Sequence, residues 1–178
     1  MHCIFSNWQP RRDDEEIFKI PEELQKGITV GHGFLKPSNI QGVAIPLIAT
    51  KRSDGIYPDL IAQSKNGSGK TGAFTIGSLL RVDSSIPKTQ VLCVCHVREL
   101  SSQIAEVYSS IAKFSDITVT DFTVTGKADG CHVVVTTLGK LINALKPARG
   151  KKSVLDLSAL RCFVIDEADI FFNEPRNH

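Results

Sequence analysis

A glycine-bearing loop with one lysine and one threonine is the first part of the sequence that has the residue types for chemistry. It runs from Gly67 to Thr71 (GSGKT), after a short apolar run at residues 60–62 and before a mostly apolar segment of helical character. Glycines let the backbone close around an anion, so that successive N–H groups point at phosphate oxygens. Lys70 would reach the β- and γ-phosphates of a nucleotide, and the Thr71 hydroxyl would hold Mg²⁺. The order strand, loop, helix predicts a phosphate-binding loop.

One position of this loop departs from the usual pattern G-x-x-x-x-G-K-[ST]. Ser64 stands where the first glycine belongs. A chance glycine-rich turn is therefore the alternative interpretation of the loop taken alone. The strand predicted before it and the helix predicted after it supply the context that a phosphate loop requires.

A second set of candidate catalytic residues follows the last predicted strand. Residues 160–165 are largely apolar and end in Asp166-Glu167-Ala168-Asp169. Ligands collect beyond the carboxyl ends of parallel strands, so we expect these carboxylates to face the phosphate loop. Asp166 would hold Mg²⁺, and Glu167 would position and deprotonate the attacking water. Taken alone, an acidic tetrad at a strand end is as often the cap of the following helix.

A glutamine near the N-terminus has the groups to recognise a base. Pro37 and Ser38 predict a helix start with Ser38 as the N-cap, which places Gln41 in the first turn. The Gln41 amide can donate and accept, as contact with the N6 and N7 edge of adenine requires. Taken alone, Gln41 is more often a surface residue of a helix.

Strands alternate with helices along the chain, which predicts an α/β fold with a mostly parallel sheet. Predicted strands lie at residues 60–62, 91–95, 117–124, 132–135 and 160–165. Predicted helices begin near Pro21, at Ser38, at Thr71 and near Arg98, and a short one ends at Leu145. In the helix that follows Ser38, the predicted buried face consists of Val43, Ala44, Leu47 and Ile48.

Size and composition fit one soluble α/β domain. The chain has 178 residues and a net charge of +2. This charge is too small for the electrostatic field of the whole protein to indicate nucleic-acid binding. Five scattered cysteines without a C-x-x-C pair favour reduced, buried thiols over a zinc site. Residues 1–16 are polar and predict a flexible arm, and no run is long enough for membrane insertion. The basic residues 146–152 are interpreted as a solvated loop, and the alternative is a patch that contacts RNA.

These segments resemble the DEAD-box ATP-dependent RNA helicases of helicase superfamily two. Residues 166–169 spell the family's name motif, and residues 62–71 match its motif I, which varies at the position of Ser64. Gly33-Phe34 with residues 37–41 matches its Q motif. Arg98-Glu99-Leu100 resembles motif Ia, and residues 137–140 resemble motif Ib. The resemblance covers residues 17–172.

The resemblance implies a three-layer RecA-like domain at residues 17–178 that binds ATP, Mg²⁺ and RNA. The residues that it implies for the nucleotide are Phe34, Gln41, Ser64, Lys65, Asn66, Gly67, Ser68, Gly69, Lys70 and Thr71. It implies Mg²⁺ held by Thr71 and Asp166, catalysis by Lys70, Asp166 and Glu167, and contact with the RNA backbone by Arg98, Thr137 and Gly139.

Four residues in two motifs, and one missing aromatic residue, depart from the family pattern. His96-Val97 replaces the usual Pro-Thr of motif Ia, and Leu138 and Lys140 replace the usual Pro and Arg of motif Ib. Loss of the threonine hydroxyl at Val97 is expected to weaken the RNA grip more than ATP binding. The aromatic residue that stacks on adenine in the family has no clear equivalent, because its aligned position is near Glu15.

Within the family, the sequence is most similar to the mRNA-export branch and to its plant members. That branch implies a nuclear-pore scaffold protein and an inositol-phosphate-dependent activator as partners, a location in the cytoplasm and nucleus, and a monomer. The sequence stops nine residues past Asp169, before the family's S-A-T motif and second RecA-like domain. From these 178 residues alone we expect weak nucleotide binding, very slow hydrolysis and an exposed sheet edge. The alternative function is an inactive, truncated paralogue that serves as an RNA- or partner-binding module.

Overall fold

The computed structural model describes residues 19–146 and 153–173 of the chain. The chain forms two compact units: unit 1 holds residues 1–82 and 107–116, and unit 2 holds residues 83–106 and 117–178. The arm predicted at residues 1–16 and the basic stretch, apart from Lys146, lie outside the described residues. None of the described helices is long and apolar enough to cross a membrane.

Unit 1 is built from helices. They are α1 (Glu22–Lys26), the π-helical turn η1 (Gly27–Gly31), α2 (Asn39–Ala49), α3 (Lys70–Leu79) and the last residues of α4 (Arg98–Ala112). The Tyr108 ring of α4 is fully buried, and its hydroxyl lies 2.8 Å from the Ser78 hydroxyl of α3. A hydrogen bond between two buried hydroxyls satisfies both polar groups, so it joins the two helices at a fixed register.

Helix α2 starts where the sequence predicts, but its buried face is different. Ser38 is the N-cap and forms a capping box with Gln41. Val43 is 63% exposed, so the prediction that it is buried was wrong. Ala44 is buried as predicted, Leu47 and Ile48 are half-buried, and the other buried residues of α2 are Gln41, Ile45 and Pro46. Sequence reasoning assigns buried positions to apolar residues, so it did not place the polar Gln41 on the buried face of α2.

The strand predicted at residues 60–62 is absent from the structure, which is a correction. Leu60 is exposed, and the Ile61 side chain is 99% exposed. An extended segment becomes a strand only when a neighbouring strand takes its backbone hydrogen bonds. The sheet of the described chain pairs four other strands and none of them pairs with residues 60–62.

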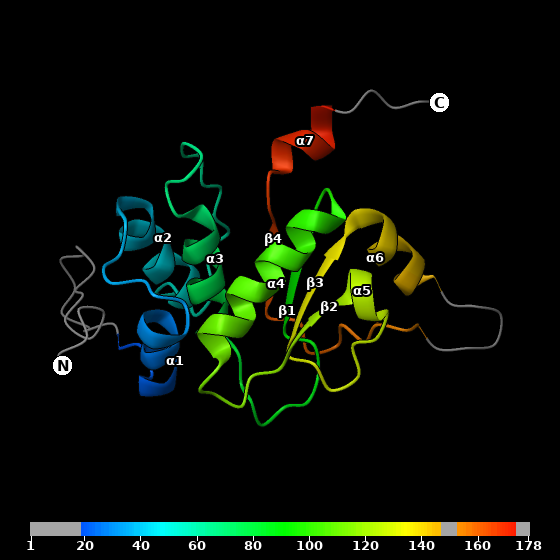
Figure 1. The fold of residues 1–178 in the computed structure, drawn as a ribbon, viewed down its shortest axis with the longest axis horizontal. Helices are drawn as coiled ribbons and strands as arrows, with labels where there is room; N and C mark the ends of the chain where they lie inside the picture. The colour runs from blue at the N-terminus through cyan, green and yellow to red at the C-terminus, as the bar shows by residue number, and fades with distance from the viewer. Residues whose placement is uncertain (1–18, 147–152, 174–178) are drawn as a thin grey trace. The chain divides into compact units, whose positions relative to one another are not determined.

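Unit 2 contains a parallel four-stranded sheet, which confirms the predicted fold class (Figure 1). Its strands are β1 (Val91–Cys95), β2 (Val119–Asp121), β3 (Val133–Thr137) and β4 (Cys162–Ile165), in the order β2-β3-β1-β4. The central strand β1 is buried along its whole length, as its continuous apolar run predicts. The other helices of this unit are α5 (Phe122–Thr125), α6 (Leu138–Leu145) and α7 (Ala168–Asn173).

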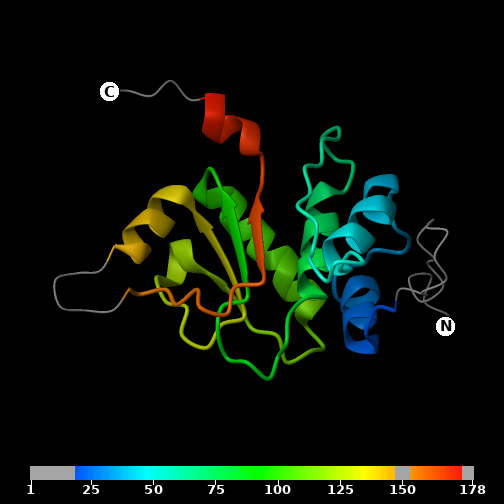
Figure 2. The same ribbon diagram turned by 180° about the vertical axis from the view of Figure 1, so that it is seen from behind.

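One face of this sheet carries a hydrophobic cluster of unit 2. Side chains of β1 and β3 pack there with residues of α5, the loop before β3, α6 and the segment before β4, namely Leu92, Val94, Phe122, Ala128, Val134, Leu141, Ala144 and Leu155. The edge strand β4 lies beside β1, as the reverse view shows (Figure 2). Its Phe163 and Ile165 pair in register with Leu92 and Val94 and are 53% and 42% exposed. Strand β4, which has one neighbouring strand among the described residues, therefore exposes apolar side chains.

The strand predicted at residues 117–124 is shorter than expected because Asp121 ends it. The Asp121 carboxylate caps α5 by accepting a hydrogen bond from the backbone N–H of Thr123 at 2.9 Å. It also accepts hydrogen bonds from two serine hydroxyls of α4, at 2.9 and 2.6 Å. Burial alone would raise the pKa of Asp121, but these hydrogen bonds lower it below its ordinary value.

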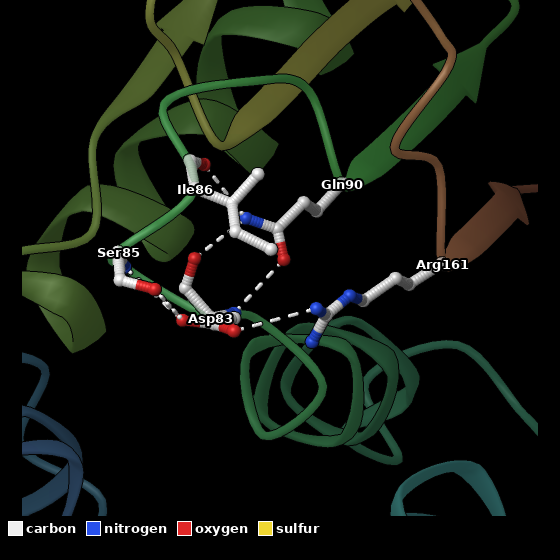
Figure 3. A network of polar contacts seen from close by, with 5 residues as sticks. All are labelled: Asp83, Ser85, Ile86, Gln90 and Arg161. Atoms are coloured by element: carbon white, nitrogen blue, oxygen red, sulfur yellow. Dashed lines mark hydrogen bonds and ion pairs between the residues drawn. The ribbon is translucent and has the colours of Figure 1, made fainter.

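A polar network fixes the amino ends of β1 and β4 (Figure 3). The fully buried Gln90 amide donates to the carbonyl oxygens of Asp83 and Ile86, at 2.7 and 3.0 Å, and accepts from the Asp83 N–H at 2.9 Å. The Asp83 carboxylate accepts from the Ser85 hydroxyl at 2.6 Å and lies 3.5 Å from the Arg161 guanidinium. Hydrogen bonds from Ser85 and the charge of Arg161 lower the pKa of Asp83. Gln90 thus holds the turn before β1 closed.

We expect Gln90→Ala to lower the free energy of unfolding by about 2–3 kcal/mol, because the fully buried side chain is lost and three half-buried backbone groups of the turn lose their partner. Denaturant unfolding followed by circular dichroism measures this change. The exposed Gln103 of α4 provides a matched control, and Gln103→Ala is expected to change the stability by less than about 0.5 kcal/mol. Equal stability of the two variants would contradict a structural role for Gln90.

Candidate nucleotide and nucleic-acid sites

The phosphate loop lies in unit 1 and has the backbone that its glycines permit. Gly67 and Gly69 adopt left-handed conformations, with φ of +74° and +96°. Gly69 is the N-cap of α3, so Lys70 and Thr71 form the first turn of this ten-residue helix. The positive end of the helix dipole and the N–H groups of its first turn lie at this loop. The loop therefore has the shape and the partial charge to receive a phosphate.

The Lys70 ammonium is held inside the loop. Its Nζ donates to the carbonyl oxygens of Ser64 and Lys65, at 2.6 and 3.2 Å. Phosphate oxygens would compete with these neutral carbonyls for the ammonium, and an anion forms the stronger hydrogen bond. The Ser68 hydroxyl is buried and has no partner among the described residues, whereas Asn66 is exposed. Contact of these side chains with a nucleotide remains a prediction.

Gln41 is a buried part of the same site, so the interpretation of it as a surface residue was wrong. Its side chain is 3% exposed. Its Oε1 accepts from the Ser38 N–H at 2.9 Å, and its Nε2 donates to the Gly69 carbonyl at 3.2 Å. One amide thus connects the start of α2 to the phosphate loop. Recognition of adenine by this amide remains a prediction.

Gly72 is a site residue that sequence reasoning missed. A Cβ on Gly72 would lie 2.5 Å from Gln41 Nε2 and 2.8 Å from Phe34 Cε2. A Cβ on Gly69 would lie 2.8 Å from Gln41 Nε2 as well. The Phe34 ring also packs edge-on against His32, with ring centroids 4.3 Å apart. Because both glycines lack side chains, Phe34 and Gln41 can lie directly against the loop.

The candidate catalytic carboxylates follow β4 in unit 2. The Asp166 N–H donates to the Val94 carbonyl at 3.0 Å, so the parallel pairing with β1 reaches one residue past the strand. Glu167 has a φ of +51° and is the one described non-glycine residue with a positive φ. A left-handed conformation is costly for a residue with a Cβ and is concentrated at functional sites. The Glu167 Oε2 lies 3.5 Å from the His96 Nδ1.

The residues predicted to contact RNA also lie at the carboxyl ends of strands in unit 2. Arg98 is exposed and begins α4, which follows β1. Thr137 ends β3 opposite Cys95 of β1 and is the N-cap of α6. Gly139 is exposed in the first turn of α6, and a Cβ added to it would meet no atom of the described residues within 4 Å. The parallel register thus brings Arg98, Thr137 and Asp166 together at the carboxyl ends of the strands. That these strand ends face the phosphate loop stays a prediction, since the loop belongs to unit 1.

Comparison with known proteins decides the family. Residues 38–178 match the family model described as DEAD/DEAH box helicase. The chain belongs to this family. The resemblance carried by the sequence motifs is therefore confirmed.

Relatives within the DEAD-box family include both plant and fungal proteins. The chain is 39% identical over 164 residues to DEAD-box ATP-dependent RNA helicase 38 of Arabidopsis thaliana, covering 86% of the chain and 31% of the relative. It is 37% identical over 158 residues to ATP-dependent RNA helicase DBP5 of Debaryomyces hansenii, covering 86% of the chain and 30% of the relative. The chain thus spans about 30% of the length of the curated relatives it matches.

Solved DEAD-box structures share the fold. Dbp5 of S. cerevisiae bound to RNA and ADP BeF3 matches with a TM-score of 0.74 and 32% identity, over 88% of this chain and 39% of that one. A DEAD box protein from Methanococcus jannaschii matches with a TM-score of 0.73 and 26% identity, over 88% and 42% of the two chains. These neighbours confirm the RecA-like α/β fold.

Proposed function

We propose that this chain is the ATP-binding part of an ATP-dependent RNA helicase, which uses ATP hydrolysis to remodel RNA or messenger ribonucleoprotein. The observation that carries the proposal is the connected site of unit 1, where the buried Gln41 is bonded to Gly69 and Lys70 lies inside the phosphate loop. A base-recognising amide and a phosphate-binding loop in direct contact suit a nucleoside triphosphate better than free phosphate.

Each predicted residue has a role in this proposal. Gln41 and Phe34 bind the adenine side, and the backbone at residues 64–69 with Lys70 binds the phosphates. Thr71 and Asp166 supply hydroxyl and carboxylate oxygens, which are the ligand types that Mg²⁺ prefers. When bound, Mg²⁺ neutralises charge on the transferred phosphoryl group.

Glu167 is proposed to orient the attacking water and to accept its proton while the bond between the γ-phosphorus and ADP breaks. Arg98 and the start of α6 at Thr137 and Gly139 are proposed to hold the RNA sugar-phosphate backbone. Such contacts position a strand without reading its sequence.

The proposed biological setting is mRNA export. The support is that the L327V variant of Dbp5 of S. cerevisiae has been solved bound to Nup159, Gle1 H337R, IP6 and ADP. We propose equivalent partners for this protein, namely a nuclear-pore scaffold protein and an inositol-phosphate-dependent activator. Action as a monomer in the cytoplasm and nucleus, including the nuclear pore, fits that setting.

ATP hydrolysis by the native protein, in the full length that its cells make, tests the proposal. We expect single-stranded RNA to stimulate release of phosphate from ATP, and we expect Lys70→Ala to abolish the stimulated rate. RNA binding without turnover of ATP, unchanged by Lys70→Ala, would contradict the proposal and would support a binding module that lacks enzymatic activity.

A further inference from the structure

The turn after β1 brings a histidine to the predicted catalytic carboxylate. His96 follows Cys95, the last residue of β1, and Glu167 is the second residue after β4. Since β1 and β4 are parallel neighbours, their carboxyl ends place both turns side by side. Both residues belong to unit 2. The His96 Nδ1 lies 3.5 Å from the Glu167 Oε2, and the two side chains are 24% and 38% exposed.

The His96 ring nitrogen nearest the Glu167 carboxylate has no hydrogen-bond partner among the described residues. This nitrogen, Nδ1, is buried. A buried polar atom without a partner is costly, so its position needs a reason. The separation of 3.5 Å is longer than the distance of about 2.8 Å at which an N–H bonds to a carboxylate. A shift of the Glu167 carboxylate by less than about one ångström closes this gap.

We propose that His96 is a positioning residue for Glu167. In this proposal the Nδ1–H of His96 donates to one carboxylate oxygen and leaves the other oxygen to accept the proton of the attacking water. The inference rests on the proposed function, because it assigns Glu167 as the base. The family motif has proline at the position of His96, and proline has no side-chain donor, so the device is a property of this chain.

The reason for such a restraint lies in the length of the glutamate side chain. A free glutamate samples many rotamers, and ordering it costs up to about 2 kcal/mol. A base must also lie within hydrogen-bond reach of the water that it deprotonates. The left-handed backbone of Glu167 aims the side chain, and His96 fixes its end. His96 itself touches neither nucleotide nor water in this proposal.

Nuclear magnetic resonance of the 178-residue chain tests the contact directly. We expect the ¹⁵N spectrum of His96 to show a proton on Nδ1, and we expect Glu167→Gln to shift the ring resonances of His96. His32, which contacts Ser110 in unit 1, and His132, which contacts Thr118, serve as internal controls whose resonances stay in place. Unchanged His96 resonances in Glu167→Gln would overturn the proposal.

Kinetics of the native protein separate positioning from a merely structural role. His96→Ala is expected to lower kcat for RNA-stimulated hydrolysis about tenfold to a hundredfold, as loss of such supporting contacts does, with the KM for ATP unchanged. His96→Asn places an amide N–H near the position of Nδ1 and is expected to recover most of kcat. In a Glu167→Gln background, His96→Ala is expected to cause no further loss.

The two proposals fail in different ways. No RNA-stimulated hydrolysis by the wild-type protein would contradict the proposed function, and the resonance comparison would still decide whether His96 contacts Glu167. Normal hydrolysis by wild type and by His96→Ala alike would overturn the role of His96 and leave the proposed function intact.

Discussion

Replacing Glu167 by glutamine is expected to reduce kcat for RNA-stimulated ATP hydrolysis by about 10²–10⁴-fold, the usual contribution of a positioned general base. Glutamine keeps the size of the side chain but has no oxygen that accepts a proton at neutral pH. The left-handed conformation of Glu167, with φ of +51°, is equally accessible to glutamine, so the fold should not change.

ATP binding is expected to survive this substitution, because the phosphate loop holds the nucleotide without Glu167. Steady-state kinetics measure kcat, and titration with a fluorescent ATP analogue measures affinity. Glu106 is exposed on α4 and provides the matched control, since Glu106→Gln alters the same chemical group away from the site. Hydrolysis by Glu167→Gln at the rate of Glu106→Gln would contradict the assignment of the base.

Replacing Gly27 by alanine is expected to give the largest loss of stability in unit 1. Gly27 begins η1, and a Cβ at this position would overlap the carbonyl oxygen of Ile111. The obstacle is backbone, so no side-chain rotation can relieve it. Overpacking of this kind costs about 1–3 kcal/mol, and we expect the upper end of that range because Gly27 is buried.

Alanine has a higher helix propensity than glycine by about 1 kcal/mol. This gain offsets part of the destabilisation caused by the clash at Gly27, and it is the only expected effect at a helical glycine without a clash. Gly139 lies in α6 with open space around its Cβ position, so Gly139→Ala is expected to leave stability unchanged or to raise it. Denaturant unfolding of both variants measures the difference. A free energy of unfolding for Gly27→Ala equal to or above that of the wild type would contradict the close packing of η1 against α4.

Features with a local physical cause could be predicted from the sequence. A continuous apolar run is sufficient to predict β1, and Pro37 followed by Ser38 is sufficient to predict the start of α2 with Ser38 as its N-cap. The turn at Gly67 and Gly69 and the helix after it follow from the glycines, which adopt the left-handed conformations that the turn requires. These structural predictions are confirmed because each depends on residues close together in the chain, whereas phosphate binding by the loop stays a prediction.

Features that depend on distant partners could not be predicted. The apolar residues 60–62 form no strand because strand formation needs a neighbour, and a short apolar run says nothing about whether one is present. The burial of Gln41 depends on the Gly69 carbonyl, 28 residues away in the chain. The contact of His96 with Glu167 arises from the parallel register of β1 and β4. A pattern within one segment holds no information about such a register.

The central claim is that Lys70 and its loop form a nucleotide site, and a binding titration tests it most directly. Wild type, Lys70→Ala and Lys127→Ala are titrated with a fluorescent ATP analogue, with Lys127 as the exposed control. Removal of a charged hydrogen bond to phosphate costs about 1.5–3 kcal/mol, so we expect Lys70→Ala to bind at least tenfold more weakly and Lys127→Ala to match wild type. Equal affinity of all three proteins would contradict a nucleotide site at this loop.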